Sequence, residues 1–193
     1  MKMQSKVNTF LAMACLGVFA GLSPAIVQAQ DAGGEHMDTG AKKMMKSADT
    51  AFAMKAAQGG MAEVKLGKLA ADKASNPDVK AFGQQMVDDH SKANDDLKST
   101  ADKEGMTLPS DVNAKQQAMY DRLSKLSGAA FDRAYVNDMV KDHEEDVKEF
   151  QREANSGKDA QIKDFASRTL PVIQGHLDKI KSIRAKTGGG SSM

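Results

Sequence analysis

The sequence predicts an all-α protein, an antiparallel four-helix bundle whose two halves are connected by an additional shorter helix. Three observations lead to this prediction. Between residues 47 and 187 the chain is rich in Ala, Lys, Asp, Leu and Met and has few runs of β-branched residues. Its apolar side chains recur at steps of three and four, as in helices that bury one face. Four long segments of similar length, with short links inside each half, fit an antiparallel bundle.

The first 29 residues have the pattern of a secretory signal peptide. A basic start precedes an apolar run from Phe10 to Leu22, and small residues at the end of the segment predict cleavage after about Ala29. The run is shorter than the ~20 residues of a transmembrane helix. Lipidation at Cys15 is a competing interpretation, but the apolar run continues well past that residue. We expect an exported protein, periplasmic or secreted, with no integral membrane segment after cleavage.

The mature chain would have 164 residues (193 − 29) and one domain. Residues 30–46 are small and polar with interrupting glycines, which predicts a disordered lead-in. The helical-bundle domain then covers 47–187, and the Gly- and Ser-rich end at 188–193 predicts a disordered tail.

Turn-forming residues separate the helices. Asn76 and Pro77 form an N-cap followed by a proline at the first helical position, Ser110 is a candidate cap, and Gly157 follows a helix. Pro171 lies inside the last pattern and should kink or split it. The predicted helices span 47–74, 77–103, 111–126, 129–155 and 159–186.

The charge balance and the single cysteine exclude several function classes. Removal of Lys2 and Lys6 from the 27 basic residues leaves 25, against 26 acidic residues that are interspersed among them. This distribution favours neither nucleic acid nor an anionic membrane surface as a partner. The mature chain lacks cysteine, which excludes disulfides and thiol chemistry.

An internal repeat is visible in the sequence. Residues 81–90 read AFGQQMVDDH and residues 134–143 read AYVNDMVKDH. Two helical hairpins related by duplication would explain the similarity, and chance resemblance in a helical chain of biased composition is the alternative.

Each long helix directs one polar residue toward the core. When the apolar stripes are traced in steps of three and four, Glu63, His90, His143 and His176 fall on the buried faces. Glu63 and His90 stand about equally far from the turn between their helices, so we expect them to face each other. Counted from Gly157, His176 lies about 7 Å further along its helix than His143, at ~1.5 Å per residue.

Buried polar groups must satisfy one another or hold a ligand, because an unpaired buried charge costs several kcal/mol. One interpretation is therefore a metal centre formed by the four inward residues, since bundle cores build metal sites from facing helices. Three imidazoles and one carboxylate suit Zn, Fe, Cu or Mn. Asp89 and Asp142 precede two of the histidines and are candidate second-shell acceptors or extra ligands. The competing interpretation is a structural His–Glu hydrogen-bonded cluster.

Several motifs together resemble a known family. They are the run EVKLGKLAADKASNPDVKAFGQQMVDDHSKAN (63–94), Asp142-His143, the block SGKDAQIKDFASRTLP (156–171) and His176-Leu177. These motifs are similar to the bacterial family known as domain of unknown function 4142, over about residues 48–183. Its members are described as predicted periplasmic or outer-membrane proteins and grouped with ferritin-like bundles, so the resemblance implies export and a ferritin-like bundle.

The resemblance implies no reaction. Ferritin-like di-iron sites use Glu-x-x-His pairs. Here the residues three positions before the histidines are Val87, Val140 and Ile173, so the sequence does not predict that centre.

Two main function hypotheses follow from the sequence. In the first, the exported protein binds one transition-metal ion, and a metalloenzyme would further need an open coordination position. In the second, it is a non-catalytic envelope or stress-related module that binds another protein or a second copy, with structural histidines. Attachment to the outer membrane would be peripheral. No catalytic motif is present, which favours a non-enzymatic role.

Overall fold

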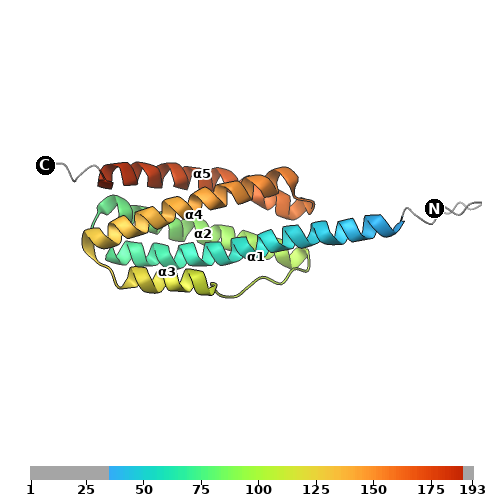
Figure 1. Cartoon of the computed structure of the whole chain (residues 1–193), viewed down its shortest axis with the longest axis horizontal. Coiled ribbons are helices and arrows are strands. Elements are labelled where there is room, and N and C mark those ends of the chain that lie inside the picture. Colours follow the sequence, from blue (N-terminus) through green and yellow to red (C-terminus); the bar gives the residue numbers. More distant parts are fainter. Residues whose placement is uncertain (1–34, 189–193) are drawn as a thin grey trace, which may run out of the picture.

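The computed structural model describes residues 35–188, and side chains from 48 to 187; this part of the chain contains five α-helices and no strand. The helices are α1 (Glu35–Lys73), α2 (Pro77–Lys103), α3 (Ala114–Ser124), α4 (Gly128–Ser156) and α5 (Ala160–Gly188). Figure 1 shows α1, α2, α4 and α5 side by side, with α2 and α4 running in one direction and α1 and α5 in the other. The short α3 packs outside them against α1 and α4. The all-α prediction is confirmed, while the predicted signal peptide at 1–29 and residues 189–193 lie outside the described part.

Most helix bounds agree with the sequence, with two exceptions. Helix α1 begins at Glu35, so the part of the expected lead-in from residue 35 onward is helical. Helix α3 begins after Asn113, not after the expected cap Ser110. The Asn113 side chain accepts a hydrogen bond from the Gln116 amide at 3.0 Å, and the Gln116 side chain accepts one from the Asn113 amide at 2.9 Å. This reciprocal capping box satisfies two amides that would otherwise lack partners, and it fixes the start of α3.

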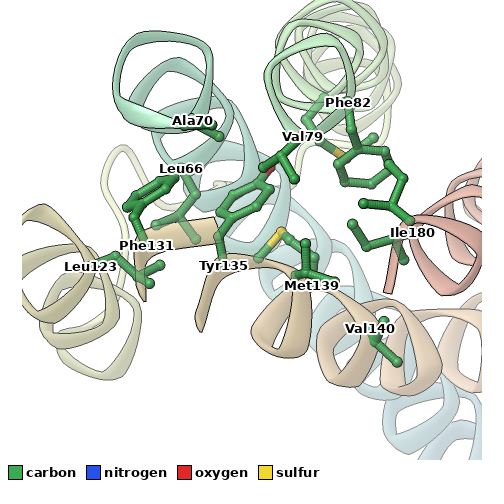
Figure 2. Close-up of a cluster of buried hydrophobic side chains, with 14 residues drawn as sticks. Leu66, Ala70, Val79, Phe82, Leu123, Phe131, Tyr135, Met139, Val140 and Ile180 are labelled. Carbon is green, nitrogen blue, oxygen red and sulfur yellow. The ribbon is translucent and has the colours of Figure 1, made fainter. Parts of the chain in front are cut away.

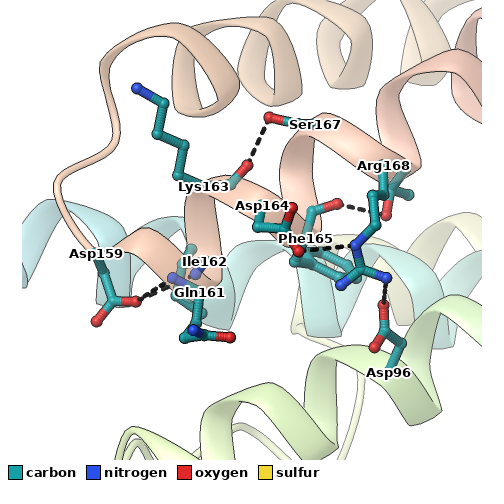
Figure 3. A network of polar contacts seen from close by, with 10 residues as sticks. Asp96, Asp159, Gln161, Ile162, Lys163, Asp164, Phe165, Ser167 and Arg168 are labelled. Carbon is teal, nitrogen blue, oxygen red and sulfur yellow. Dashed lines mark hydrogen bonds and ion pairs between the residues drawn. The ribbon is translucent and has the colours of Figure 1, made fainter.

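Helices α2 and α5 both begin with a side-chain cap. The cap of α2 is the one that the sequence predicts. Asn76 accepts hydrogen bonds from the amides of Asp78 and Val79, with Pro77 in the first helical turn. Asp159 accepts equivalent bonds at the start of α5, which Figure 3 shows. In the same view Arg168 of α5 reaches Asp96 of α2 at 3.0 Å. The expected split at Pro171 is not found, because α5 continues through it.

Each hairpin holds the turn of the other through a buried carboxylate. Asp132 of α4 accepts hydrogen bonds from the backbone amides of Ser75 and Asn76 at 3.1 and 2.9 Å, and from the Ser75 hydroxyl. Asp49 of α1 accepts the backbone amides of residues 158–159 in the other turn. We call these contacts the reciprocal turn contacts. They fix both ends of the bundle, since charge-assisted hydrogen bonds are about twice as strong as neutral ones.

Helices α1 and α2 approach closely where two glycines meet. A Cβ atom added to Gly67 would lie 2.6 Å from the carbonyl oxygen of Gly83, and one added to Gly83 would lie 2.7 Å from the carbonyl oxygen of Gly67. Real Cβ atoms do not approach a backbone oxygen this closely. The hairpin therefore depends on the absence of a side chain at both positions.

The apolar core consists of two clusters separated by a polar layer. The first cluster, shown in Figure 2, lies toward the α1–α2 turn and contains Phe82, Phe131 and Tyr135. The second lies toward the α4–α5 turn and contains Phe150 and Phe165. Each large side chain contributes roughly 1.5–3 kcal/mol when it is fully buried. Each long helix places one buried polar residue between the members of the two clusters: Glu63, His90, His143 or His176.

Candidate metal centre

The four inward polar residues meet in the layer between the two apolar clusters. The exposed fractions of Glu63, His90, His143 and His176 are 2%, 6%, 0% and 1%. Their positions follow from the helical period, because each one continues the apolar stripe of its helix. The prediction that all four lie on buried faces is confirmed, and their side chains converge.

Glu63 of α1 and His90 of α2 face each other, as expected from their distances to the turn. Glu63 Oε2 lies 2.9 Å from His90 Nδ1. Burial lowers the pKa of His90, but the negative charge of Glu63 outweighs this effect and the pKa rises above its ordinary value. Burial likewise acts to raise the pKa of Glu63, and the neighbouring imidazoles, His90 first, hold it below its ordinary value. Glu63 is therefore the anion of the layer.

His143 of α4 is anchored by its own helix. Its Nδ1 atom lies 3.0 Å from the carbonyl oxygen of Met139. Because a carbonyl can only accept, Nδ1 carries the proton and Nε2 of the neutral ring carries a lone pair. Burial lowers the pKa of His143, which keeps the ring neutral. Its Nε2 lies 3.5 Å from Glu63 Oε1.

His176 of α5 lies level with the other histidines. Its ring centroid is 5.6 Å from that of His143 and 5.3 Å from that of His90. The sequence predicts that His176 lies about 7 Å further from the turn than His143. The actual offset is smaller, because residues 157–159 form the turn and add no helical rise.

A carboxylate on α2 holds the His176 ring. Its Nε2 atom lies 2.9 Å from Asp89 Oδ2. Burial lowers the pKa of His176, so Nε2 donates to Asp89 from a neutral ring and Nδ1 carries the lone pair. Asp89 was expected to serve an inward histidine, and it serves the one on α5, not its neighbour His90.

Four buried polar atoms of this layer have no hydrogen-bond partner. They are His90 Nε2, His143 Nε2, His176 Nδ1 and Glu63 Oε1. One ring nitrogen from each of the three histidines lies within 4.8 Å of those from the other two. The layer thus contains converging donor atoms from all four long helices.

Two further carboxylates lie beside Glu63. One oxygen each from Glu63, Asp142 and Asp146 lie within 4.8 Å of one another. Burial, followed by the charge of Glu63, raises the pKa of Asp142 to about 7 and that of Asp146 well above its ordinary value. Among the described side chains, Asp142 makes no hydrogen bond or ion pair with a histidine, and its close neighbours are the carboxylates of Glu63 and Asp146. Asp146 was not predicted, although it lies one helical turn after Asp142 on the same face.

A small cavity of about 20 Å³ adjoins the layer. Glu63, His90 and Asp146 form its polar wall, and the remaining wall is mainly apolar. Small residues of the inward stripes, such as Gly59 and Ala93, leave this space open. A water molecule needs ~10–15 Å³, so the cavity can hold about one.

The sequence pattern of the family described as "Domain of unknown function (DUF4142)" matches residues 34–183. This match confirms the resemblance drawn from the motifs. No curated protein shows a significant match to the chain. In the described residues, no helix combines the length and the apolar character needed to cross a membrane.

Solved structures of three bacterial proteins have similar folds. A DUF305 fragment from Deinococcus radiodurans has a TM-score of 0.64 at 10% identity, covering 72% of this chain and 96% of its own. A DUF305 protein from Streptomyces coelicolor, named as secreted, has a TM-score of 0.62 at 14% identity, covering 73% and 94%. A conserved hypothetical protein from Mycobacterium tuberculosis has a TM-score of 0.59 at 17% identity, covering 77% and 96%. The TM-scores show a shared fold, and at such low sequence identities they show the fold alone.

Proposed function

The chain belongs to the family described as Domain of unknown function (DUF4142), and we propose that it is an exported protein that binds one transition-metal ion. The ligands would be His90, His143, His176 and Glu63. The proposal rests on the arrangement of buried donor atoms between the two apolar clusters.

The observation that carries the proposal is the pairing of the imidazole rings. Each ring uses one nitrogen for an acceptor outside the histidine cluster: Glu63, the Met139 carbonyl or Asp89. The other nitrogen of each ring is buried without a partner. Metal-bound histidines have this arrangement, because the second nitrogen donates to a carboxylate or carbonyl that fixes the ring and raises its basicity.

The contact between Glu63 and His143 supports the same conclusion. Glu63 Oε1 and His143 Nε2 are 3.5 Å apart, and both carry lone pairs. Two buried acceptors this close repel each other and leave two desolvation costs of roughly 1–3 kcal/mol each unrelieved. A cation bound by both atoms removes the repulsion and satisfies both groups.

The donor set limits the metal to a class. Three imidazoles and one carboxylate suit Zn, Fe, Cu or Mn, and the mature chain has no thiolate. When bound, such an ion supplies a positive centre that can polarise a small ligand. The protein's own groups would orient the three rings and exclude bulk water, since all four side chains are nearly inaccessible.

A role as a protein-interaction module with purely structural histidines is the alternative. Such a cluster would satisfy its ring nitrogens with one another or with carboxylates. The three unpartnered ring nitrogens do not fit that arrangement.

Export is the second part of the proposal. It is supported by the signal-peptide pattern of residues 1–29. The structurally similar protein from Streptomyces coelicolor is named as secreted. We expect a periplasmic or secreted location, and cell fractionation together with N-terminal sequencing of the mature protein would test it.

The metal proposal is tested by elemental analysis of untagged protein purified from the periplasm. The parent is compared with two variants, His90→Ala/His143→Ala and His36→Ala. His36 is the one histidine of the sequence that is not a candidate ligand, so its variant is the matched control. We expect about one metal ion per chain in the parent and in the His36 variant, and none in the double variant. Circular dichroism confirms that each variant is folded.

Two results would contradict the proposal. One is a parent that contains no metal and takes up none on reconstitution with Zn²⁺, Fe²⁺, Cu²⁺ or Mn²⁺. The other is a folded double variant that retains the parent's metal content.

A further inference from the structure

We propose a second cation site beside the first, formed by Glu63, Asp142 and Asp146, that takes a hard divalent cation. Glu63 would be shared by the two sites, because it also faces His90 and His143. The shared role of Glu63 rests on the proposed function, while the second site does not depend on it.

The backbone places the three carboxylates together. Asp142 and Asp146 are separated by one turn of α4, so their side chains leave the same face of the helix. Glu63 reaches toward that face from α1. One oxygen from each residue lies within 4.8 Å of those from the other two, which is a ligand-sized separation.

No lysine or arginine side chain contacts the two aspartates directly in the described part of the chain, although the charges of Lys115 and Lys55 act on Asp142 and Asp146 from a longer distance. Among the side chains described from 48 to 187, neither Asp142 nor Asp146 has an ion pair or hydrogen bond with a lysine or arginine. Lys55, which lies on the facing helix, binds Glu149 instead. Among the described side chains, no lysine or arginine therefore forms an ion pair with either aspartate of this cluster.

Two observations direct a ligand to this position, and the first concerns a Glu63 oxygen that also faces His143 Nε2 at 3.5 Å. The Glu63 side chain is 2% exposed, and its Oε1 atom has no hydrogen-bond partner. In addition, the cavity of about 20 Å³ has both Glu63 and Asp146 in its wall. An acidic cluster at an ordinary surface has neither a buried unpartnered oxygen nor an adjoining cavity.

The donor atoms distinguish the two sites. Carboxylate oxygens suit Mg²⁺, Mn²⁺ or Ca²⁺, whereas the imidazoles suit Zn, Cu or Fe. Asp142 and Asp146 are partly exposed, while the histidines are buried. The second cation should therefore exchange with solvent faster than the first.

The test uses full-length mature protein whose histidine site is first filled with one equivalent of Zn²⁺. Mn²⁺ is then titrated and its binding is followed by electron paramagnetic resonance. We expect the Zn²⁺-loaded parent to bind one further Mn²⁺. Asp142→Asn/Asp146→Asn should keep its Zn²⁺ and lose the Mn²⁺, because amide oxygens lack the negative charge. Asp88→Asn/Asp95→Asn removes the same charge from the exposed side of α2 and should bind both ions.

The outcomes separate this inference from the proposed function. A parent that binds Zn²⁺ but no Mn²⁺, or an Asp142/Asp146 variant that binds Mn²⁺ like the parent, overturns the second site alone. A parent that takes up no Zn²⁺ yet binds one Mn²⁺ through the two aspartates supports the second site and contradicts the first. If the double variant does not fold, Asp146→Asn alone is measured, and Mn²⁺ affinity equal to that of the parent overturns the inference.

Discussion

Each histidine of the polar layer is oriented by one hydrogen-bond partner. Two of these partners are not candidate metal ligands, and the third, Glu63, is one. Asp89 holds His176 across the helix interface, at 2.9 Å. The Met139 carbonyl holds His143 within its own helix. Glu63 holds His90 with one oxygen and leaves the other free. These three anchors fix the ring orientations and leave one buried nitrogen of each ring without a partner.

Asp89→Asn should weaken metal binding without unfolding the bundle. The substitution removes the negative charge that raises the basicity of His176, and loss of such a partner typically lowers metal affinity about 10–100-fold. Competition against a chromophoric chelator measures the change. Asp88→Asn, on the exposed face next to it, is the control and should leave affinity unchanged. Equal affinity in the Asp89 variant and the parent would show that His176 does not need this carboxylate.

A buried acid pair away from the centre makes stability depend on pH. Burial, then the charge of Asp49 and a hydrogen bond with it, raise the pKa of Glu153 to about 7. Asp159 also raises this pKa, while Arg152 lowers it. The folded state thus keeps a proton that the unfolded chain, with an ordinary Glu pKa near 4.3, has lost. Stability from this group is complete below about pH 4 and is lost as pH rises to about 7.

Glu153→Gln should remove this pH dependence. An amide can donate to Asp49 at every pH, so we expect a higher melting temperature than the parent at pH 8 and little difference at pH 5. Thermal unfolding followed by circular dichroism at the two pH values provides the measurement. A difference of equal size at both values would mean that Glu153 does not titrate in this range.

The sequence predicted which residues of the site point inward and that Glu63 faces His90, but not the partners of the other two histidines. Steps of three and four placed Glu63 and the three histidines on buried faces, because that period depends on one helix alone. The partner of Asp89 depends on the rotation of α2 against α5, which no single-helix pattern contains. The position of Asp142 beside Glu63 depends in the same way on how α4 packs against α1, and Asp146 was missed although it shares the helix face of Asp142.

At the scale of the elements, the pair of glycines sets the distance between α1 and α2. Gly67→Ala should destabilise the protein by about 1–3 kcal/mol, because the added methyl group would overlap the Gly83 carbonyl and separate the helices. This cost exceeds the ~1 kcal/mol by which Ala favours a helix over Gly. Urea unfolding measures the free energy.

Gly59→Ala is the matched control in the same helix. No atom lies within 4 Å of a Cβ atom at Gly59, so only the helix propensity should act there. We expect a gain of roughly 0.5–1 kcal/mol. Destabilisation of both variants by the same amount would show that close approach of the helices is not the cause.

Helix bounds were predicted well where a cap residue has no competitor nearby. Asn76 with Pro77 fixed the start of α2 correctly. Between residues 105 and 113, in contrast, both Ser110 and Asn113 are good caps. Asn113 is used because Gln116 completes the capping box three residues later, a signal that was present in the sequence.

At the scale of the whole molecule, a buried polar layer divides the core. Metal binding in this layer should therefore increase the free energy of unfolding. Without an ion, the layer holds four unpartnered buried atoms. An ion that binds only the folded state adds about 2.7 kcal/mol of unfolding free energy at a hundred times its Kd.

Removal of metal with a chelator should therefore lower the melting temperature of the parent. The same chelator should not change that of the folded His90→Ala/His143→Ala variant. Differential scanning calorimetry with and without Zn²⁺ measures both values. An equal response of the two proteins to Zn²⁺ would place the stabilising ion elsewhere.

The reciprocal turn contacts and the sequence repeat match different helices of the two hairpins with each other. The same number of residues separates Asp49 from Asp132 as separates Asn76 from Asp159. This spacing pairs α1 with α4 and α2 with α5, whereas the repeated motif compares α2 with α4. The similar motifs thus lie in the second helix of one hairpin and the first helix of the other, and both motifs end in a histidine of the polar layer.

The reciprocal turn contacts also have a consequence for a single hairpin on its own. In each half, the carboxylate on the first helix reaches the turn of the other half and never its own. An isolated hairpin would thus have backbone amide donors in its turn and a carboxylate acceptor on its first helix that cannot form hydrogen bonds with each other. Two identical hairpins could satisfy both by pairing across a twofold axis, so the single chain has the connectivity of two such hairpins joined in sequence.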